Sequence, residues 1–500
     1  MACAASRAER AARARSTRVA ASPMPGTSSR PPSRGRAALA GAQEIAAGGR
    51  YASRMDQPRG TLHGERNGGL TPLALLAGMS GNLMEWYDFA LYGVLAATLG
   101  ELFFPHGNRL AALLAVFGVF AAGYVMRIVG GAWFGHVGDR LGRRRALLLS
   151  AVAMAVATSL VGLLPTWETA GVVAPLLFTA LRLVQGLSVG GEFTTSITYL
   201  IEHAPPGRRG LQGSLASLTA GAGILLGSAI GNALFALFTT EEVLAGAWRL
   251  PFLLSVPLGL SLAVLRAALP DDTMPRPAAD AAATALRERS PVWHVLREHP
   301  GEILRGALLG FGPSAAFCAI AVFLASFLTT EKILPESSAL SLETTSIAFM
   351  VVLTPLAGHL GDRFGRKPMV IAGVAGCMLA AVPLFVLLRT GSGERDLWAE
   401  LAFATFVVAA LSPYQVWLAE CFPRELRASG LGLAYNGAAG LLGGTTPLAC
   451  TTLADLTGSA LAPGAYVAFA CALSLAIALR TGETAPTATP AQRRRPAGSP

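Results

Sequence analysis

The sequence predicts an all-α polytopic membrane protein, and three observations lead to this fold class. Of the 500 residues, 52% are hydrophobic and 14% are charged, whereas a soluble domain averages about 25% charged residues. Apolar stretches recur along most of the chain, and an α-helix needs roughly 20 such residues to cross about 30 Å of hydrocarbon. These stretches do not alternate apolar and polar residues at a period of two, which excludes a transmembrane barrel.

Twelve apolar segments are expected to be membrane-spanning helices. The first six occupy residues 73–98, 111–134, 146–165, 172–202, 211–238 and 247–269. The other six occupy residues 302–329, 343–360, 369–388, 398–421, 429–455 and 463–480. A polar stretch between the two sets divides the chain into two halves of six helices each.

The domain boundaries follow from these segments. We expect the first six-helix half at 71–269, a cytoplasmic central loop at 270–301 and the second half at 302–481. We interpret 1–70 and 482–500 as disordered tails. The first tail holds twelve Arg and four acidic residues, so it carries most of the formal net charge of +10. The membrane part is therefore nearly neutral, and the basic excess does not indicate nucleic-acid binding.

Basic residues in the loops predict how the chain is oriented. Loops that follow even-numbered segments contain clusters of Arg and Lys, whereas the other loops hold only scattered basic residues. By the positive-inside rule, the even loops and both termini are expected to be cytoplasmic. The clustered basic residues are Arg140, Arg143, Arg144, Arg145, Arg208, Arg209, Arg363, Arg366, Lys367, Arg424 and Arg427.

The chain also repeats itself. "GHVGDRLGRRR" begins at Gly135 and "GHLGDRFGRKP" begins at Gly358, with seven of eleven positions identical at an offset of 223. A second pair of motifs repeats at an offset of 218; it consists of Glu202, Pro205 and Arg209, matched by Glu420, Pro423 and Arg427. Two parallel repeats of six helices are typical of a transporter whose halves rock around a site near the middle of the bilayer.

Five ionisable residues lie well inside the expected spans, all in the first half: Glu85, Asp88, Arg127, Arg182 and Glu192. Such residues cost a few kcal/mol each in a bilayer, so they persist where they face a cavity or one another. Asn82, Glu85, Asp88 and Tyr92 form one stripe at helical spacing, and Arg182, Gln185, Glu192 and Ser196 fall within one sector of another helix. We expect these two stripes to line one aqueous cavity.

The charge count suggests a mechanism. Three carboxylates face two guanidiniums, so one carboxylate is expected to lack a partner and to take up a proton. Asp88 or Glu85 is the expected carrier, with Arg127, Arg182 and Glu192 tuning it. The alternative is that all five groups form fixed ion pairs that orient the helices.

Several motifs together resemble a known family. The repeated loop resembles the signature loop of the major facilitator superfamily. "GNLMEWYDFALYG", "MRIVGGAWFGHVGDRLGRR", "RLVQGLSVGGEFTTS", "WRLPFLL" and "SGLGLAYNGAAGLLGGTTPL" look like its metabolite:proton symporter branch. The resemblance covers about residues 72–480. It implies the major facilitator fold, alternating access, and proton-coupled import of a small polar or carboxylate-bearing metabolite across the bacterial inner membrane.

The resemblance also implies a role for the two repeated loops, 135–145 and 358–368, which we call the latch loops. In the family they hold the cytoplasmic side closed in one state. Glycines allow a tight turn, the Asp is expected near the N-terminus of a neighbouring helix, and the Arg residues can pair with carboxylates or lipid phosphates. The alternative is a purely basic cytoplasmic anchor. The expected latch residues are Gly135, Gly138, Asp139, Arg140, Gly142, Arg143, Gly361, Asp362, Arg363, Gly365 and Arg366.

Substrate contacts are expected from several segments. The resemblance places polar cavity residues at Tyr435 and Asn436, and the preceding segment offers Tyr414 and Gln415. Three residues of the polar stripes complete the set: Asn82, Tyr92 and Gln185. Phe323 and Phe327 stand where the branch usually has hydroxyl-bearing rings, which predicts that polar groups are missing from a cavity wall.

The sequence therefore favours a monomeric transporter in a lipid bilayer that moves an organic acid, amino acid or compatible solute together with protons. Neither a cofactor nor a metal is expected, and the six Cys show no CxxC spacing. No nucleophile elbow, metal-ligand cluster or phosphate loop indicates an enzyme. The alternatives are another porter of the superfamily, for sugars or drugs, and a transporter-like sensor that binds a ligand without moving it.

Overall fold

The computed structural model describes residues 72–104, 109–267 and 291–485, which are helical apart from short connections. The expected tail at 1–70 lies outside the described residues, as do 268–269 at the end of the expected first half, 270–290 of the expected central loop and 486–500 of the second tail.

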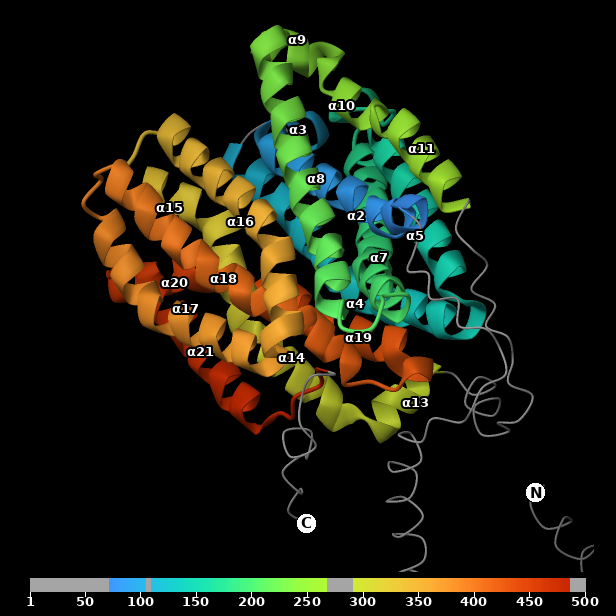
Figure 1. The fold of residues 1–500 in the computed structure, drawn as a ribbon. Coiled ribbons are helices and arrows are strands. Elements are labelled where there is room, and N and C mark those ends of the chain that lie inside the picture. The colour runs from blue at the N-terminus through green and yellow to red at the C-terminus, as the bar shows by residue number, and fades with distance from the viewer. Residues whose placement is uncertain (1–71, 105–108, 268–290, 486–500) are drawn as a thin grey trace, which may run out of the picture. The chain divides into compact units, whose positions relative to one another are not determined.

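The first half of the described chain consists of long helices with short connecting pieces (Figure 1, blue to green). They are α2 (Pro72–Val94), α3 (Ala96–Phe103), α4 (Arg109–Leu141), α5 (Arg143–Val161), α6 (Trp167–Ala170), α7 (Val173–Glu202), α8 (Arg209–Leu237), α9 (Thr240–Glu242), the π-helical turn η2 (Val243–Ala247), α10 (Arg249–Leu253) and α11 (Ser255–Ala267).

The second half follows the same plan (Figure 1, yellow to red). It contains α13 (Pro291–Glu298), α14 (Pro300–Cys318), η3 (Ala319–Phe323), α15 (Leu324–Thr330), α16 (Glu336–Phe364), α17 (Arg366–Leu388), α18 (Glu394–Glu420), the 3₁₀ turn η4 (Arg424–Leu426), α19 (Arg427–Asn436), η5 (Gly437–Gly443), α20 (Thr446–Thr457) and α21 (Ala462–Arg480). The turns η3 and η5 are π-helical and interrupt two otherwise continuous segments.

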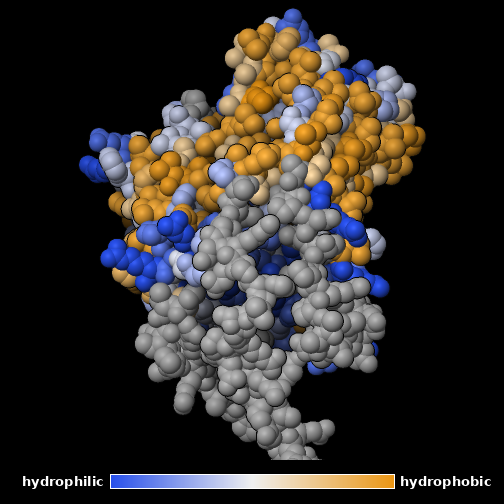
Figure 2. Space-filling view, turned by 45° about the vertical axis from the view of Figure 1, so that its right-hand side comes forward, coloured by the Kyte–Doolittle hydropathy of each residue, from blue (hydrophilic) through white to orange (hydrophobic). Residues whose placement is uncertain are grey.

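Helices overlap every expected span, and nine helices in the described residues are long and apolar enough to cross a membrane. The expected number of twelve spans stays a prediction. Large apolar side chains such as Leu237, Leu260 and Val264 are exposed to the surroundings. Figure 2 shows a broad region of hydrophobic residues across the upper part of the face, with hydrophilic residues at its top and below it, beside the grey atoms. This is the surface expected of a bundle surrounded by lipid.

Glycine residues let helices approach closely in the first half. On α8, Gly223 and Gly227 lie so near α2 that an added Cβ would be 2.3 Å from the Leu83 carbonyl oxygen and 2.5 Å from that of Tyr87. Small residues at four-residue spacing are the usual means of such packing in membranes. The close contact fixes α2, which carries Glu85 and Asp88, against α8.

The two halves meet along α4 with α19 and along α8 with α16. Gly131 of α4 faces the backbone of Gly432, and Gly210 of α8 faces the backbone of Gly358. These contacts join segments that are about 150 or 300 residues apart in the chain, and they leave a space between the halves further along the bundle.

Candidate functional site

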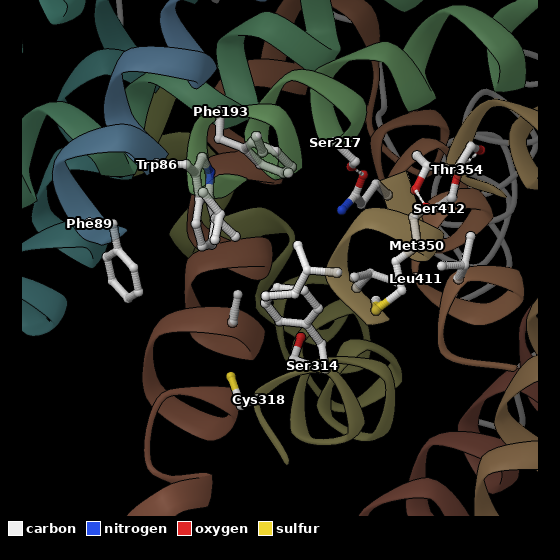
Figure 3. Close-up of a pocket in the computed structure, with 18 of the residues that line it drawn as sticks. Trp86, Phe89, Phe193, Ser217, Ser314, Cys318, Met350, Thr354, Leu411 and Ser412 are labelled. Carbon is white, nitrogen blue, oxygen red and sulfur yellow. Dashed lines mark hydrogen bonds between the residues drawn. The ribbon is translucent and has the colours of Figure 1, made fainter. Parts of the chain in front are cut away.

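A pocket lies between the two halves, with about 960 Å³ of empty space including its opening. Helices α2, α4, α7 and α8 form one side, and elements of the second half from α14 to η5 form the other. Figure 3 shows Trp86 and Phe193 on one side of it, and Met350, Thr354 and Ser412 on the other. Its mostly apolar walls with a few polar groups are typical of a small-molecule site. The aromatic lining residues are Trp86, Phe89, Tyr124, Phe193, Phe317 and Tyr435.

Arg127 brings positive charge to the wall of this pocket. It is 4% exposed, and its Nη2 lies 3.4 Å from Glu85 Oε1. Its guanidinium carbon lies 5.2 Å from the ring centre of Tyr124 and 5.8 Å from that of Trp86. Within the described residues, Arg127 Nε and Glu85 Oε2 are buried without a hydrogen-bond partner. The ion pair at the pocket is therefore long and incompletely satisfied.

Asp88 lines a smaller neighbouring space and accepts more hydrogen bonds than Glu85 does. Arg182 Nη1 donates to its Oδ2 over 2.5 Å. Gln185 Nε2 and Thr158 Oγ1 donate to its Oδ1 over 2.7 and 3.1 Å. The Arg182 guanidinium also lies 4.1 Å from the ring centre of Tyr92, which is a cation–π distance. These contacts bring the two polar stripes together, and the aqueous cavity expected between them stays a prediction.

Glu192 is paired with a residue that the sequence analysis missed. Arg266 of α11 is fully buried and donates through two nitrogens to both Glu192 oxygens, and Ser150 also donates to this carboxylate. Within the described residues, each of the three carboxylates that the sequence analysis counted, Glu85, Asp88 and Glu192, thus contacts a guanidinium. The expectation that one of them lacks a partner is wrong, because the count of five charges omitted Arg266.

Two of the seven expected substrate contacts line the central pocket. Gln415 Oε1 accepts a hydrogen bond from Ser217 Oγ over 2.7 Å, and Tyr435 stacks on Phe193 with ring centres 5.0 Å apart. Gln185 instead lines a smaller space beside Arg182.

The other expected contacts have structural partners away from the central pocket. Asn82 donates to Ser196 Oγ over 3.2 Å and to the Ala216 carbonyl over 3.3 Å. The Tyr92 hydroxyl donates to the Val116 carbonyl over 2.6 Å, and that of Tyr414 donates to the Gly306 carbonyl over 3.0 Å. Asn436 donates to the Gly190 and Gly432 carbonyls over 2.9 and 2.7 Å. These four side chains therefore join helices rather than face the pocket.

Phe323 and Phe327 also lie outside the pocket wall. They pack against Phe385, with ring centres 6.4 and 5.3 Å away. Both side chains are 5% exposed. The expectation that they form an apolar cavity wall is wrong, because η3 and α15 direct both rings into the core of the second half, against α17.

The Asp of each latch loop binds the start of a helix in the opposite half. Asp139 accepts the backbone N–H groups of Ala428 and Ser429 at the start of α19, over 3.2 and 2.8 Å. Asp362 accepts those of Gly210 and Leu211 at the start of α8, over 2.7 and 2.8 Å. Because the helix N-terminus favours an anion, the two bonds to Asp139 confirm its expected placement, and the two bonds to Asp362 repeat it. They also go beyond what a purely basic anchor explains.

Ion pairs in the first latch loop reinforce this cross-connection. Arg143 lies 2.8 Å from Asp139 and 3.2 Å from Glu202, and Arg427 of the other half lies 3.3 Å from Glu202. Gly142 turns the chain at a φ of 100°, which favours glycine.

The second latch loop repeats the arrangement. Arg366 lies 2.9 Å from Asp362 and 3.5 Å from Glu420, and Arg209 lies 3.8 Å from Glu420. Gly365 has a φ of 104°. Glu483, within the expected second tail, accepts the backbone N–H of Arg366 over 3.1 Å.

Of the remaining latch residues, the three glycines are buried in contacts between elements and the two arginines are exposed. Gly135 packs against the backbone of Ala428 and Ser429, Gly138 touches the Ala428 side chain, and Gly361 lies against Pro413. Arg140 and Arg363 are exposed. The two exposed arginines therefore lie outside the contacts that join the halves.

Two helical halves, a pocket between them, paired charges inside apolar helices and reciprocal contacts at one end are the features of a membrane transporter built from two repeats. Residues 73–447 match the family described as Major Facilitator Superfamily. The chain belongs to this superfamily, whose members similar to it are transporters rather than enzymes.

Curated relatives and solved structures agree with this assignment. The chain is 34% identical to the ectoine/proline transporter ProP of Corynebacterium glutamicum, over 79% of this chain and 80% of that protein. It is 32% identical to the citrate-proton symporter of Klebsiella pneumoniae (82% and 91%) and 31% identical to the shikimate transporter of Escherichia coli K12 (81% and 93%). A structure of the proton:xylose symporter XylE has the same fold, with a TM-score of 0.67 at 20% identity over 83% of this chain and 96% of that one.

Proposed function

We propose that the protein imports a small carboxylate-bearing metabolite together with a proton. The observation that carries the proposal is the Glu85–Arg127 pair, because it alone among the three described intramembrane pairs places its guanidinium at the central pocket. The relatives that transport proline, shikimate and citrate all act on carboxylates.

Glu85 is the proton carrier in this proposal. Asp88 accepts three hydrogen bonds from side chains and Glu192 accepts three as well, whereas Glu85 has one contact at 3.4 Å and one oxygen without a partner. Protonation of Glu85 therefore gives up fewer stabilising interactions than protonation of either of the other two carboxylates. It also removes the charge that holds Arg127, so the guanidinium becomes available to the carboxylate of the substrate.

Coupling follows from this exchange of partners. A proton on Glu85 strengthens binding of an anionic substrate to Arg127, and by reciprocity the bound substrate strengthens proton uptake at Glu85. Substrate affinity is therefore expected to rise as the pH falls. Since the loaded site carries both species, neither crosses efficiently without the other.

The latch loops support an assignment of direction. Their basic residues place them on the cytoplasmic side under the positive-inside rule, and both loops are engaged across the halves. We therefore assign the structure to a state whose cytoplasmic end is closed, with the substrate reaching the pocket from outside. The relatives are bacterial, which supports placement in a bacterial cell membrane.

Uptake into proteoliposomes tests this function and separates transport from mere sensing. With an acidic exterior, at least one of proline, betaine, shikimate, citrate or alpha-ketoglutarate should accumulate, and a protonophore should abolish the accumulation. Glu85→Gln should still bind substrate, with an affinity that no longer depends on pH, and should lose proton-driven accumulation. Glu101→Gln, which changes an exposed carboxylate on α3, is the matched control. Wild-type accumulation by Glu85→Gln would overturn the assignment of the carrier.

A further inference from the structure

The walls of the central pocket carry information about the substrate that the fold alone does not. We propose that the preferred ligand is a monocarboxylate with an apolar body about the size of one ring; this inference rests on the proposed transport function and names its substrate class.

Buried donors in the pocket call for one strong acceptor. Within the described residues, Arg127 Nε, Trp86 Nε1 and Ser314 Oγ are buried without a hydrogen-bond partner, and the three residues line the pocket. The Ser314 hydroxyl can donate or accept, whereas the two nitrogens can donate but cannot accept. Buried polar groups are almost always paired in proteins, so the ligand is expected to supply the missing acceptor. A carboxylate that binds Arg127 would also lie next to Trp86, because the guanidinium carbon lies 5.8 Å from the Trp86 ring centre.

The number of positive groups argues against a ligand with several carboxylates. Arg127 is the one basic residue among the described lining residues of the central pocket. Arg182 is held by Asp88 and Gln185 and lines the neighbouring smaller space instead. A second or third carboxylate would therefore be buried without a cation, which is costly.

The aromatic rings argue against a quaternary ammonium group. The Arg127 guanidinium already lies over Trp86 and Tyr124, and Phe193 is stacked on Tyr435. A ligand cation would compete with Arg127 for the same ring faces. Among the described lining residues there is also no carboxylate to balance such a cation.

The opposite wall suits an apolar body. Ile347, Met350 and Val351 of α16 and Leu411 of α18 line it, together with Phe317 of α14. Figure 3 shows Met350 and Leu411 across the pocket from Trp86. A ring that extends from the carboxylate toward this wall removes apolar surface from water on both sides, which favours binding.

Titration calorimetry on the purified full chain tests the substrate class with three probes: benzoate, glycine betaine and citrate. Benzoate should bind at least tenfold more tightly than either of the others. Equal or tighter binding of betaine or citrate, or no binding of benzoate, would overturn the inference. The proposed function is judged separately: if benzoate binds but is not accumulated under a proton gradient, the substrate class stands and the coupled import fails. If citrate or betaine binds best and is accumulated, the coupled import stands and the proposed substrate class fails.

One substitution examines the carboxylate position directly. Trp86→Phe keeps a ring at this position and removes the Nε1–H donor, so benzoate affinity should fall about tenfold, as for loss of a hydrogen bond to a charged group. Trp133→Phe is the matched control, because Trp133 is 62% exposed on α4 and does not line the pocket. An unchanged affinity in a folded Trp86→Phe variant would refute this placement of the carboxylate.

Discussion

Weakening the latch should open the latch end of the bundle by an amount that the structure allows us to estimate. Asp139 accepts two backbone N–H groups from α19 and pairs with Arg143. Asp139→Asn retains one acceptor oxygen, so one buried N–H loses its partner and the ion pair loses its charge. An unsatisfied buried donor costs about 1–3 kcal/mol. We take about 2 kcal/mol, which corresponds to about a 30-fold shift of the equilibrium toward the open state.

The second latch loop allows the same estimate for a double variant, because the free-energy changes of the two substitutions should add. Asp362 makes the equivalent contacts with the start of α8, at a site distant in sequence and without shared partners. Independent sites contribute nearly additively to free energy. The variant with both Asp139→Asn and Asp362→Asn should therefore shift the equilibrium by about 4 kcal/mol, until the open state predominates.

Cys318 provides a native reporter for this prediction, since it lines the central pocket. The assay measures its alkylation by a membrane-impermeant maleimide applied from the latch side, with peptide mass spectrometry to separate it from other cysteines. The rate should rise about 30-fold in Asp139→Asn and further in the double variant. Asp455→Asn, which changes an exposed carboxylate on α20, should behave as wild type. Unchanged alkylation in the folded double variant would refute the view that these contacts hold the end closed.

Two further predictions concern stability in detergent. Arg266→Met leaves Glu192 buried without a cation, which should cost about 3–5 kcal/mol and lower the unfolding midpoint. Adding Glu192→Gln should restore most of the lost stability. An unshifted midpoint in the single variant would contradict the pairing. Gly186→Ala places a Cβ 2.1 Å from the Gly123 carbonyl oxygen between α7 and α4, so overpacking should cost about 1–3 kcal/mol. Gly93→Ala, where a Cβ meets open space, should not lower the midpoint, and equal effects of the two changes would refute the close packing.

The latch contacts are predictable from sequence because they depend on a repeated motif. Asp139 and Asp362 occupy equivalent positions of the two loops, and Glu202 and Glu420 follow equivalent helices. Each half therefore offers both a carboxylate and a helix N-terminus. Reciprocal pairing is then the arrangement that satisfies both copies, and the structure has it.

Arg266 could not be recognised by the same reasoning. It lies in the last turn of α11, just before a polar stretch, and a basic residue there normally indicates a helix end at the membrane surface. The only hint in the sequence is that apolar residues flank it on both sides. Its burial depends on how α11 packs against α2 and α5, which is a property of the tertiary fold.

The pocket walls were equally inaccessible to sequence reasoning, because apolar lining residues have no signature of their own. Met350 and Leu411 line the pocket. Their residue types and their positions along the helices do not distinguish them from side chains that face lipid or the core. Conversely, polar residues such as Asn82 and Asn436 attract attention but satisfy backbone carbonyls between helices. Polarity inside a membrane helix indicates burial, and burial alone does not indicate contact with a substrate.

The distribution of charge suggests how the two halves divide the work of coupling. The intramembrane ion pairs all lie in the described first half, whereas the second half supplies most of the apolar wall of the pocket. Arg127, which is paired with Glu85, belongs to both the charged network and the wall of the pocket. In our proposal, a substrate at Arg127 contacts the first half through charge and the second half through apolar side chains. Because the latch contacts join these same halves, closing of the pocket is linked in this proposal to release of the latch.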